Sequence, residues 1–436
     1  MTKLDDRAKK RQLLKEKSER HKKPQDSAKL LNIWLSETET SVDLAHIFQS
    51  LQDNRKNIEQ LQKCSDVIVK FTNKACQTNR AMELLLAIEY LIQDYDDFEK
   101  RIPANLYISK YNCLKHCENL DLEAEDCLHK AITLSLSETE RINCYLLLSL
   151  YYEDISEYKK MKILLIECKN FCIKYPENEE LLVRTWVCLG HYYFYKFNFI
   201  KSKKYFNQAT IKLELLCNQQ AYKWLLRTLS DCLHYLSRIY FEEHNFIKSA
   251  KFLLKSQNVL EASCQANNLT PDVGATAFYH LRLGQLLEAS QLQYSAKYHF
   301  DECRRRFNDR GNGSSTLVHV NLALANLIKN ESRDIKYNFQ KEEEQLKYSA
   351  KQALVKGYSR GYLMALVQLL SLYKNNIKLH LLIKVVWDIL VSKEFYNLGG
   401  IFFLISYIHH KLYIKFRPNQ ILLICPCPDP KCKIAG

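Results

Sequence analysis

The chain has 436 residues and a formal net charge of +14, with only 10 glycines and 8 prolines. This length can bury an extended core, and the scarcity of Gly and Pro argues against a protein of many short strands and tight turns. The longest C-terminal apolar run, residues 398–408, is too short to cross a bilayer as a helix, so we expect no membrane partner.

The N-terminal segment 1–28 is basic and is predicted to be a disordered tail. Residues 1–30 contain 11 Lys/Arg and 5 Asp/Glu. Two basic clusters are compatible with a nuclear localisation signal or a nucleic-acid contact: Arg7, Lys9, Lys10, Arg11, Lys22 and Lys23. A solvated tail without a binding role is the alternative. No aromatic residue lies among these charges, so base stacking is not encoded and nucleic acid ranks below protein as a partner.

Two weaker helix pairs follow the tail. Small and apolar residues at helical spacing mark them: Ala124, Leu128 and Ala131 in the first, and Ser149, Tyr152, Met161, Leu165 and Cys168 in the second. Single prolines, Pro103 and Pro176, lie between the apolar-periodic segments of this region. Long helices joined by short turns are therefore expected here.

A stronger helix-pair signature then occurs three times at a spacing of 47 residues. The aligned positions are Trp186, Leu189, Gly190, Tyr193, Ser202, Phe206 and Ala209, then Leu233, Leu236, Ser237, Tyr240, Ser249, Leu253 and Ser256, then His280, Leu283, Gly284, Leu287, Ala296, Phe300 and Cys303. The turn NFIKS at 198–202 also returns at 245–249. Fixed-period similarity indicates stacked supersecondary units.

The spacing of small and bulky residues within each unit resembles the tetratricopeptide repeat (TPR), whose usual period is 34 residues. Each unit here is 13 residues longer, about two extra turns per helix. We therefore predict an all-α fold, a right-handed α-solenoid of TPR-like antiparallel helix pairs over residues 29–388. A generic helical bundle with accidental similarity is the alternative.

The C-terminal segment 389–436 is predicted to be an apolar terminal helix followed by a Cys/Pro tail. His409, His410, Cys425, Cys427 and Cys432 raise the possibility of a zinc site. Their spacing is irregular and lacks a paired C-x2-C, so we predict no metal and no cofactor.

Cysteine use indicates the compartment. The chain has 16 cysteines, scattered along helical stripes rather than arranged as a disulfide framework. The first residues are charged, unlike a secretory signal peptide. We therefore predict a reducing, cytoplasmic or nuclear location and buried thiols.

Catalysis has no support in the sequence. The nucleotide-binding, hydrolase and zinc-protease motifs are missing from it. His191, His234 and Asp231 could titrate in a groove, but a histidine on a repeat helix is more often a packing or surface residue. We predict that the chain is not an enzyme and has no small-molecule substrate.

Stacked helix pairs present a concave face lined by their first helices. The residues expected there are Arg184, Val187, His191, Phe194, Asp231, His234, Arg238, Phe241, Phe278, Leu281, Gln285 and Glu288. This lining has no Lys/Asn clamp for a C-terminal carboxylate, and its aromatic and charged mixture suits an extended peptide or a helix. The alternative is that a neighbouring segment, residues 330–350, fills the groove.

Four stretches resemble the helical arm of separase, the protease that opens cohesin at anaphase: residues 145–150, Lys223-Trp224 with Leu229 and Cys232, residues 252–260, and residues 283–288. The similarity spans about residues 105–305. The His-Gly pair of the separase protease domain is missing from the sequence, so the resemblance implies a non-catalytic part.

In some insects a separate helical subunit of that family, the Three rows type, joins the protease and the inhibitor securin. The resemblance therefore implies a scaffold in sister-chromatid separation, with a separase-type protease and securin as partners. The alternative is an unrelated TPR-type adaptor, associated with a motor or a cohesin loader.

Overall fold

The computed structural model describes residues 81–97, 101–116, 121–155, 157–219, 223–266, 273–308, 315–328, 335–355, 359–375 and 379–390, with a few helical positions between 62 and 72. Every element in these ranges is a helix, which confirms the predicted all-α class. The chain divides into two compact units, residues 1–144 and 145–436, and each is described by itself. The predicted basic tail lies outside the described residues, as does the C-terminal segment beyond residue 390.

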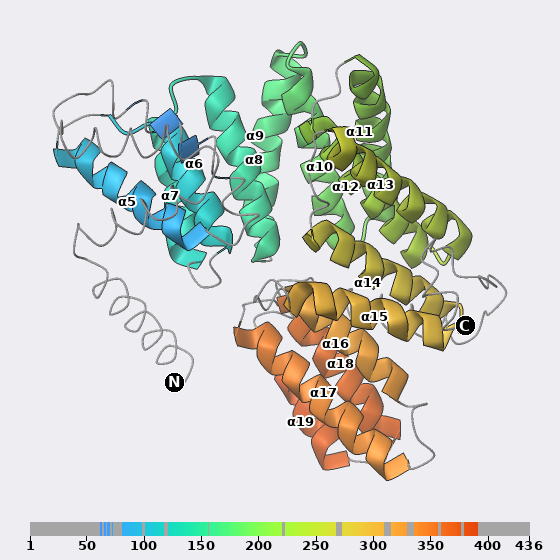
Figure 1. Ribbon diagram of the computed structural model, residues 1–436. Coiled ribbons are helices and arrows are strands. Elements are labelled where there is room, and N and C mark those ends of the chain that lie inside the picture. The colour runs from blue at the N-terminus through green and yellow to red at the C-terminus, as the bar shows by residue number, and fades with distance from the viewer. Residues whose placement is uncertain are drawn as a thin grey trace. The chain divides into compact units, whose positions relative to one another are not determined.

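The first unit contains α5 (Ala81–Asp97), α6 (Ala104–His116) and α7 (Asp121–Leu134), which pack in chain order (Figure 1). Lys110 of α6 links the three helices, because its Nζ lies 3.1 Å from Glu89 Oε1 and 2.9 Å from Glu123 Oε1. Burial opposes the charge on Lys110, but the two carboxylates outweigh that effect and raise its pKa. Ala124, Leu128 and Ala131 of α7 are buried.

The second unit is a series of long helices joined by short connections (Figure 1). Following α8 (Glu138–Asp154), which begins in the first unit, they are α9 (Tyr158–Lys174), α10 (Glu179–Tyr195), α11 (Phe199–Gln219), α12 (Lys223–Glu242), α13 (Phe246–Ala266), α14 (Val273–Ala289), α15 (Gln293–Asn308), α16 (Ser315–Ile328), α17 (Ile335–Val355), α18 (Ser359–Asn375) and α19 (Leu379–Leu390).

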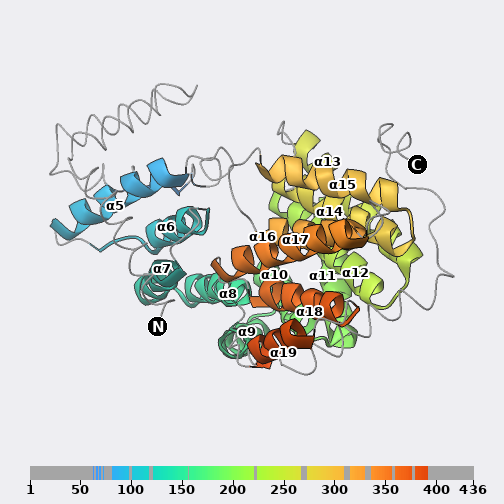
Figure 2. The same cartoon turned by 90° about the horizontal axis from the view of Figure 1, so that it is seen from below.

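Antiparallel pairs are the building blocks of this unit. The most extensive packing joins α10 to α11, α12 to α13 and α14 to α15, and both views show these pairs side by side (Figures 1 and 2). Further packing of α11 on α12, and of α13 on α14, joins one pair to the next. This succession is the helical-repeat arrangement that the sequence predicts. Residues 335–350, which we considered as a filling of the groove, belong to α17, whose extensive packing is with α16 and α18.

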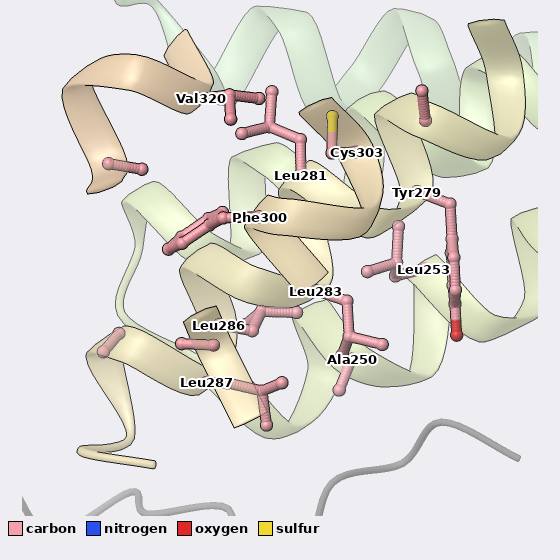
Figure 3. Packing of buried hydrophobic residues seen from close by; sticks show 14 of the residues in the cluster. Ala250, Leu253, Tyr279, Leu281, Leu283, Leu286, Leu287, Phe300, Cys303 and Val320 are labelled. Carbon is pink, nitrogen blue, oxygen red and sulfur yellow. The ribbon is translucent and has the colours of Figure 1, made fainter. Parts of the chain in front are cut away.

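A close approach between the two helices of a pair occurs at the small residues of the repeat. A Cβ atom added to Gly190 would lie 2.8 Å from the Phe206 ring, and one added to Gly284 would lie 2.5 Å from the Phe300 ring. The glycines are therefore needed for space, since real Cβ contacts are longer than this. Figure 3 shows Phe300 with Leu283 and Leu286 in one buried cluster.

The middle pair makes the same close approach with a different combination of side chains. Ser237 and Leu253 occupy the positions of glycine and phenylalanine, and both are buried. Ser237 Oγ donates to the Ser249 carbonyl, and Ser249 Oγ donates back to the Ser237 carbonyl, each at 2.8 Å. Ser230 and Ser256 make a second reciprocal pair at 2.9 and 2.8 Å. Hydroxyl groups thus link the helices without leaving buried polar atoms unbonded.

The turns inside the three pairs have one geometry. Phe197, His244 and Gln291 have φ values of 56°, 59° and 66°, each 47 residues after the last. In the first turn, Phe197 N donates to Phe194 O at 3.0 Å, and Asn198 N donates to Tyr193 O at 2.9 Å. The other two turns repeat both bonds. This is the Schellman motif, and its positive-φ position is occupied here by residues other than glycine.

The repeated NFIKS turn also caps the second helix. Asn198 Oδ1 accepts the backbone N–H of Lys201 at 3.1 Å, and Asn245 Oδ1 accepts that of Lys248 at the same distance. An asparagine in this position satisfies one of the unpaired N–H groups of the first turn. The entry into α11 and α13 is therefore fixed by the sequence of the turn.

The lack of space at Gly190 predicts that Gly190→Ala destabilises the wild-type chain but stabilises a Phe206→Leu chain. In the wild-type chain, Gly190→Ala pushes a methyl group into the Phe206 ring, and overpacking of this kind costs about 1–3 kcal/mol. In a Phe206→Leu chain, which copies the Ser237–Leu253 pairing, the same change gains helix propensity of up to about 1 kcal/mol. Urea unfolding of the four chains measures both effects. Equal effects of Gly190→Ala in the two backgrounds would show that the ring does not limit this contact.

Candidate partner-binding face

The first helices of the three pairs bring polar and aromatic side chains together on one side of the second unit. We call this set the first-helix face and define it by six residues: His191 of α10, His234 and Arg238 of α12, and Phe278, Arg282 and Gln285 of α14. Five of them are partly buried, whereas Phe278 is 40% exposed.

A buried hydrogen bond between His191 and Glu153 and a tyrosine lie at one end of the face. His191 Nδ1 lies 2.8 Å from Glu153 Oε2, and both side chains are at most 12% exposed. The hydroxyl of Tyr235 donates to the other carboxylate oxygen at 3.4 Å and lies 3.2 Å from the Tyr195 hydroxyl. The rings of His191 and Tyr235 stack with centroids 4.1 Å apart. Removal of Glu153 would leave these buried polar groups without their acceptor, which is costly.

Arg238 extends this network across α12. Its guanidinium lies 4.3 Å from the ring centroid of Phe194 and 4.7 Å from that of Tyr235. A third ring, Tyr195, lies 5.9 Å away. Cation–π contacts of this kind hold the charge in one orientation. They also explain why Phe194 is only 1% exposed, since Arg238 and Tyr235 cover it.

The other end of the face carries its most exposed ring. The Phe278 ring lies edge-on to His234 with centroids 6.4 Å apart. Burial lowers the pKa of His234 well below its usual value, and the positive charges of Arg282 and Arg238 lower it further. His234 is therefore neutral at pH 7 and contacts the Phe278 ring as an uncharged polar side chain.

A shallow pocket opens between α12, α13 and α14. It encloses only about 10 Å³, about the space of one water molecule, and is lined by Ser237, Arg238, Phe241, Glu242, Ser249, Arg282, Gln285 and Leu286. Arg282 Nη1 donates to Gln285 Oε1 at 2.6 Å, which orients the guanidinium along the pocket. The pocket is a shallow depression lined by residues of both charges.

The structure joins six of the twelve residues that the repeat spacing assigned to the binding face. His191, His234, Arg238, Phe241, Phe278 and Gln285 belong to one network of ring, hydrogen-bond and pocket contacts. Three others lie apart from it: Arg184 pairs with Glu180 on α10 at 3.8 Å, Asp231 is exposed, and Glu288 is partly buried. Their role in binding stays a prediction.

Three residues expected on that surface are instead buried: Val187, Phe194 and Leu281, with 9%, 1% and 0% exposure. Val187 and Phe194 belong to a buried cluster with residues of α11 and α12, and Leu281 belongs to one with residues of α13, α15 and α16. Conversely, repeat spacing missed Glu153, Tyr195 and Tyr235. One signal could have found Glu153: it follows Ser149 by four residues, as Phe194 follows Gly190.

The residues predicted to be structural lie inside the pairs. Gly190, Phe206, Ala209, Gly284, Ala296 and Phe300 are buried, and Trp186, Tyr193 and Tyr240 are partly buried. Tyr193 stacks on Tyr205 with centroids 5.6 Å apart, and Tyr240 stacks on Phe252, one repeat later, at 5.2 Å.

Eight of the ten described cysteines are buried, whereas Cys217 and Cys264 are partly exposed. Burial raises the pKa of Cys127 to about 11 and those of Cys188 and Cys303 to about 12. A nucleophilic cysteine needs a lowered pKa, so these thiols are poor nucleophiles at neutral pH.

Several predictions concern parts of the chain outside the described ranges. The basic residues Arg7, Lys9, Lys10, Arg11, Lys22 and Lys23 lie there, as do His409, His410, Cys425, Cys427 and Cys432. Within the described ranges, no three His, Cys, Asp or Glu side chains are grouped as a metal site. None of the helices described there is long and apolar enough to span a bilayer.

Comparison with known proteins finds only distant similarity. No family model matches the sequence, and no curated protein matches it significantly. A Rap protein complexed with competence and sporulation factor is 11% identical with a TM-score of 0.47, covering 81% of this chain and 99% of its own. The apo form of RapI is 13% identical with a TM-score of 0.42, and the match covers 82% of this chain and 99% of RapI.

The human IFIT1 dimer with PPP-AAAA is 14% identical, with a TM-score of 0.39, covering 90% of this chain and 95% of its own. Identities and scores this low carry no argument about function. The assignment of a helical-repeat fold therefore rests on the helix pairing described above.

The lowered pKa of His234 predicts that the folded protein becomes less stable at acidic pH. Since the folded protein binds a proton at His234 less readily than the unfolded chain does, its contribution to stability is full above pH 6.5 and falls as the pH drops below that value. Between pH 7.5 and 5.5 the loss is up to about 1 kcal/mol. His234→Gln should remove this part of the pH dependence, as measured by urea unfolding at both values. An identical pH dependence in the variant would contradict the assignment.

Proposed function

We propose that this chain is a non-catalytic scaffold that binds partner proteins through the first-helix face. The observation that carries the proposal is the Phe278 ring, which is 40% exposed beside His234, with Arg238 and Arg282 close by. Large aromatic rings and arginines are the side chains that contribute most to protein–protein binding. An exposed ring in such surroundings suits an apolar anchor on another protein.

The shape of the binding partner follows from the arrangement of the face. Its residues come from three successive helix pairs, so a ligand that touches all of them must be elongated, as an extended peptide or a helix is. Arg238 is held over three rings, and Arg282 is oriented by Gln285. A surface organised before binding loses less side-chain entropy on association.

A non-catalytic role is supported by the state of the titratable groups. The buried cysteines have raised pKa values, and His191 is committed to Glu153 and stacked on Tyr235. An active site would need a nucleophile next to an accessible base.

The finer form of the proposal rests on sequence resemblance. It makes the chain a component of a separase complex, with a separase-type protease and securin as partners, acting in sister-chromatid separation in the cytoplasm or nucleus. The residues that resemble the helical arm of separase support it. The competing function is an unrelated adaptor, associated with a motor or a cohesin loader. The location of the face on positions common to any helical repeat supports this alternative.

Affinity purification of the tagged full chain from mitotic cells tests the proposal. Phe278→Asp should deplete specific co-purifying proteins about tenfold, because the anchor ring is lost and a charge is placed in its contact, worth about 1.4 kcal/mol or more. Ile163→Asp is the matched control, since Ile163 is a 64% exposed apolar residue of α9. Its purification should equal that of the wild-type chain, and the thermal midpoints of all three should agree.

Two outcomes decide between the forms of the proposal. Retention of every co-purifying protein by Phe278→Asp would exclude the first-helix face as the binding surface. If Phe278 is needed but neither a separase-type protease nor securin is among the depleted proteins, the separase assignment is excluded and the adaptor remains.

A further inference from the structure

A row of exposed apolar side chains lies at the turns of the three central helix pairs. Ile200, Ile247 and Tyr294 are 82%, 60% and 79% exposed. Each is the second residue of the second helix of its pair, and they are 47 residues apart. We call these three residues the hairpin-tip row.

The exposure of this row is set by the register of the helices. Phe246, the first residue of α13, is 3% exposed in the core cluster, and Phe199 packs against the corresponding cluster of the preceding pair. Because successive residues of a helix point about 100° apart, the residue after the buried phenylalanine faces solvent. Single exposed apolar residues are ordinary, but the same repeat position is exposed and apolar in three successive pairs, which core packing does not require.

The backbone that carries the first two residues of the row is fixed by hydrogen bonds. Asn198 and Asn245 cap the helices that carry them, and the Schellman turns precede these caps. Lys255 of α13 bonds to Glu214 of α11 at 2.7 Å, so the two second helices are neighbours. A partner would therefore meet an ordered edge rather than a loose loop.

Positive charge accompanies the first two residues of the row, on α11 and α13. Lys201, Lys204, Lys248 and Lys251 are all exposed. None of the four has a carboxylate within ion-pair distance among the described residues, whereas Lys203 pairs with Glu243 at 2.6 Å. Lys201 and Lys248 instead lie 5.3 and 5.6 Å from the ring centroids of Tyr193 and Tyr240. The first turns of α11, α13 and α15 contain no acidic residue.

We propose that the hairpin-tip row binds an acidic segment of a partner protein that carries apolar side chains. Its apolar groups would contact Ile200, Ile247 and Tyr294, and its carboxylates would pair with the lysines on either side. Charge complementarity of this kind selects the partner and speeds association. The row is separate from the first-helix face and does not depend on it.

Two other occupants fit the row less well. A second copy of this chain would place the same lysines against each other in a symmetric contact, and like charges would repel. A membrane surface favours a continuous apolar face that enters the acyl boundary, whereas this row has one apolar residue per helix pair with lysines between them.

Selection of a phage-displayed library of random dodecapeptides on the full chain supplies the probe. Selected peptides should be rich in Asp and Glu interspersed with Leu, Ile or Phe. Binding of a fluorescent selected peptide is then measured by anisotropy. Ile200→Ser/Ile247→Ser and Lys201→Glu/Lys248→Glu should each weaken it at least tenfold. The lysine changes place Glu in the first turn of a helix, where it is favourable, so folding is expected to be preserved.

The matched control is Ile211→Ser/Leu215→Ser, which removes two exposed apolar residues farther along α11. It should leave the affinity unchanged. Binding that is lost in Phe278→Asp and kept in both tip variants would overturn this inference while supporting the first-helix face. Selection of peptides without acidic residues would also overturn it. So would a chain that binds no peptide but sediments with phosphatidylserine vesicles or self-associates in ultracentrifugation, if the changes at Ile200 and Ile247 abolish that behaviour.

Discussion

The contact between a small residue of one helix and a large side chain of the next governs this fold. At Gly190 and Gly284 there is no room for a Cβ atom, because Phe206 and Phe300 fill the space. In the middle pair, serine and leucine replace these residues, and reciprocal hydroxyl bonds join the helices. Each pair is thus closed at an equivalent point. The helices cannot slide along each other without losing this fit.

The same contact determines what the surface can display. The small residues fix which side of each first helix is buried in the pair. His234 and Arg238 of α12 and Arg282 of α14 therefore lie on the opposite side, in the first-helix face. The network from Glu153 through Tyr235 to Arg238 then spans neighbouring helices and holds their side chains in place. The second helices begin from turns of one geometry, which puts Ile200, Ile247 and Tyr294 at equivalent edges. The two proposed binding surfaces arise from repetition rather than from a single cavity.

Much of this could be predicted from the sequence, because spacing encodes helix faces. The buried positions Phe206, Ala209, Ala296 and Phe300 follow from periodicity alone. Phe194 was misplaced, because whether a residue near the edge of a face is covered depends on the neighbouring helix, here through Arg238. The three Schellman turns had no glycine to mark them. Glu153 pairs across 38 residues, and such long-range pairing has no local signal.

The repeated contacts imply that equivalent points of successive helix pairs are interchangeable. Deletion of residues 199–245 joins Asn198 to Phe246 and removes one whole unit while restoring the NFIKS turn. Thermal unfolding followed by circular dichroism should then show one cooperative transition with proportionately less helix. Deletion of residues 199–238, which breaks the register, should abolish that transition. If both deletions unfold the chain equally, the pairs are not equivalent and the account is wrong.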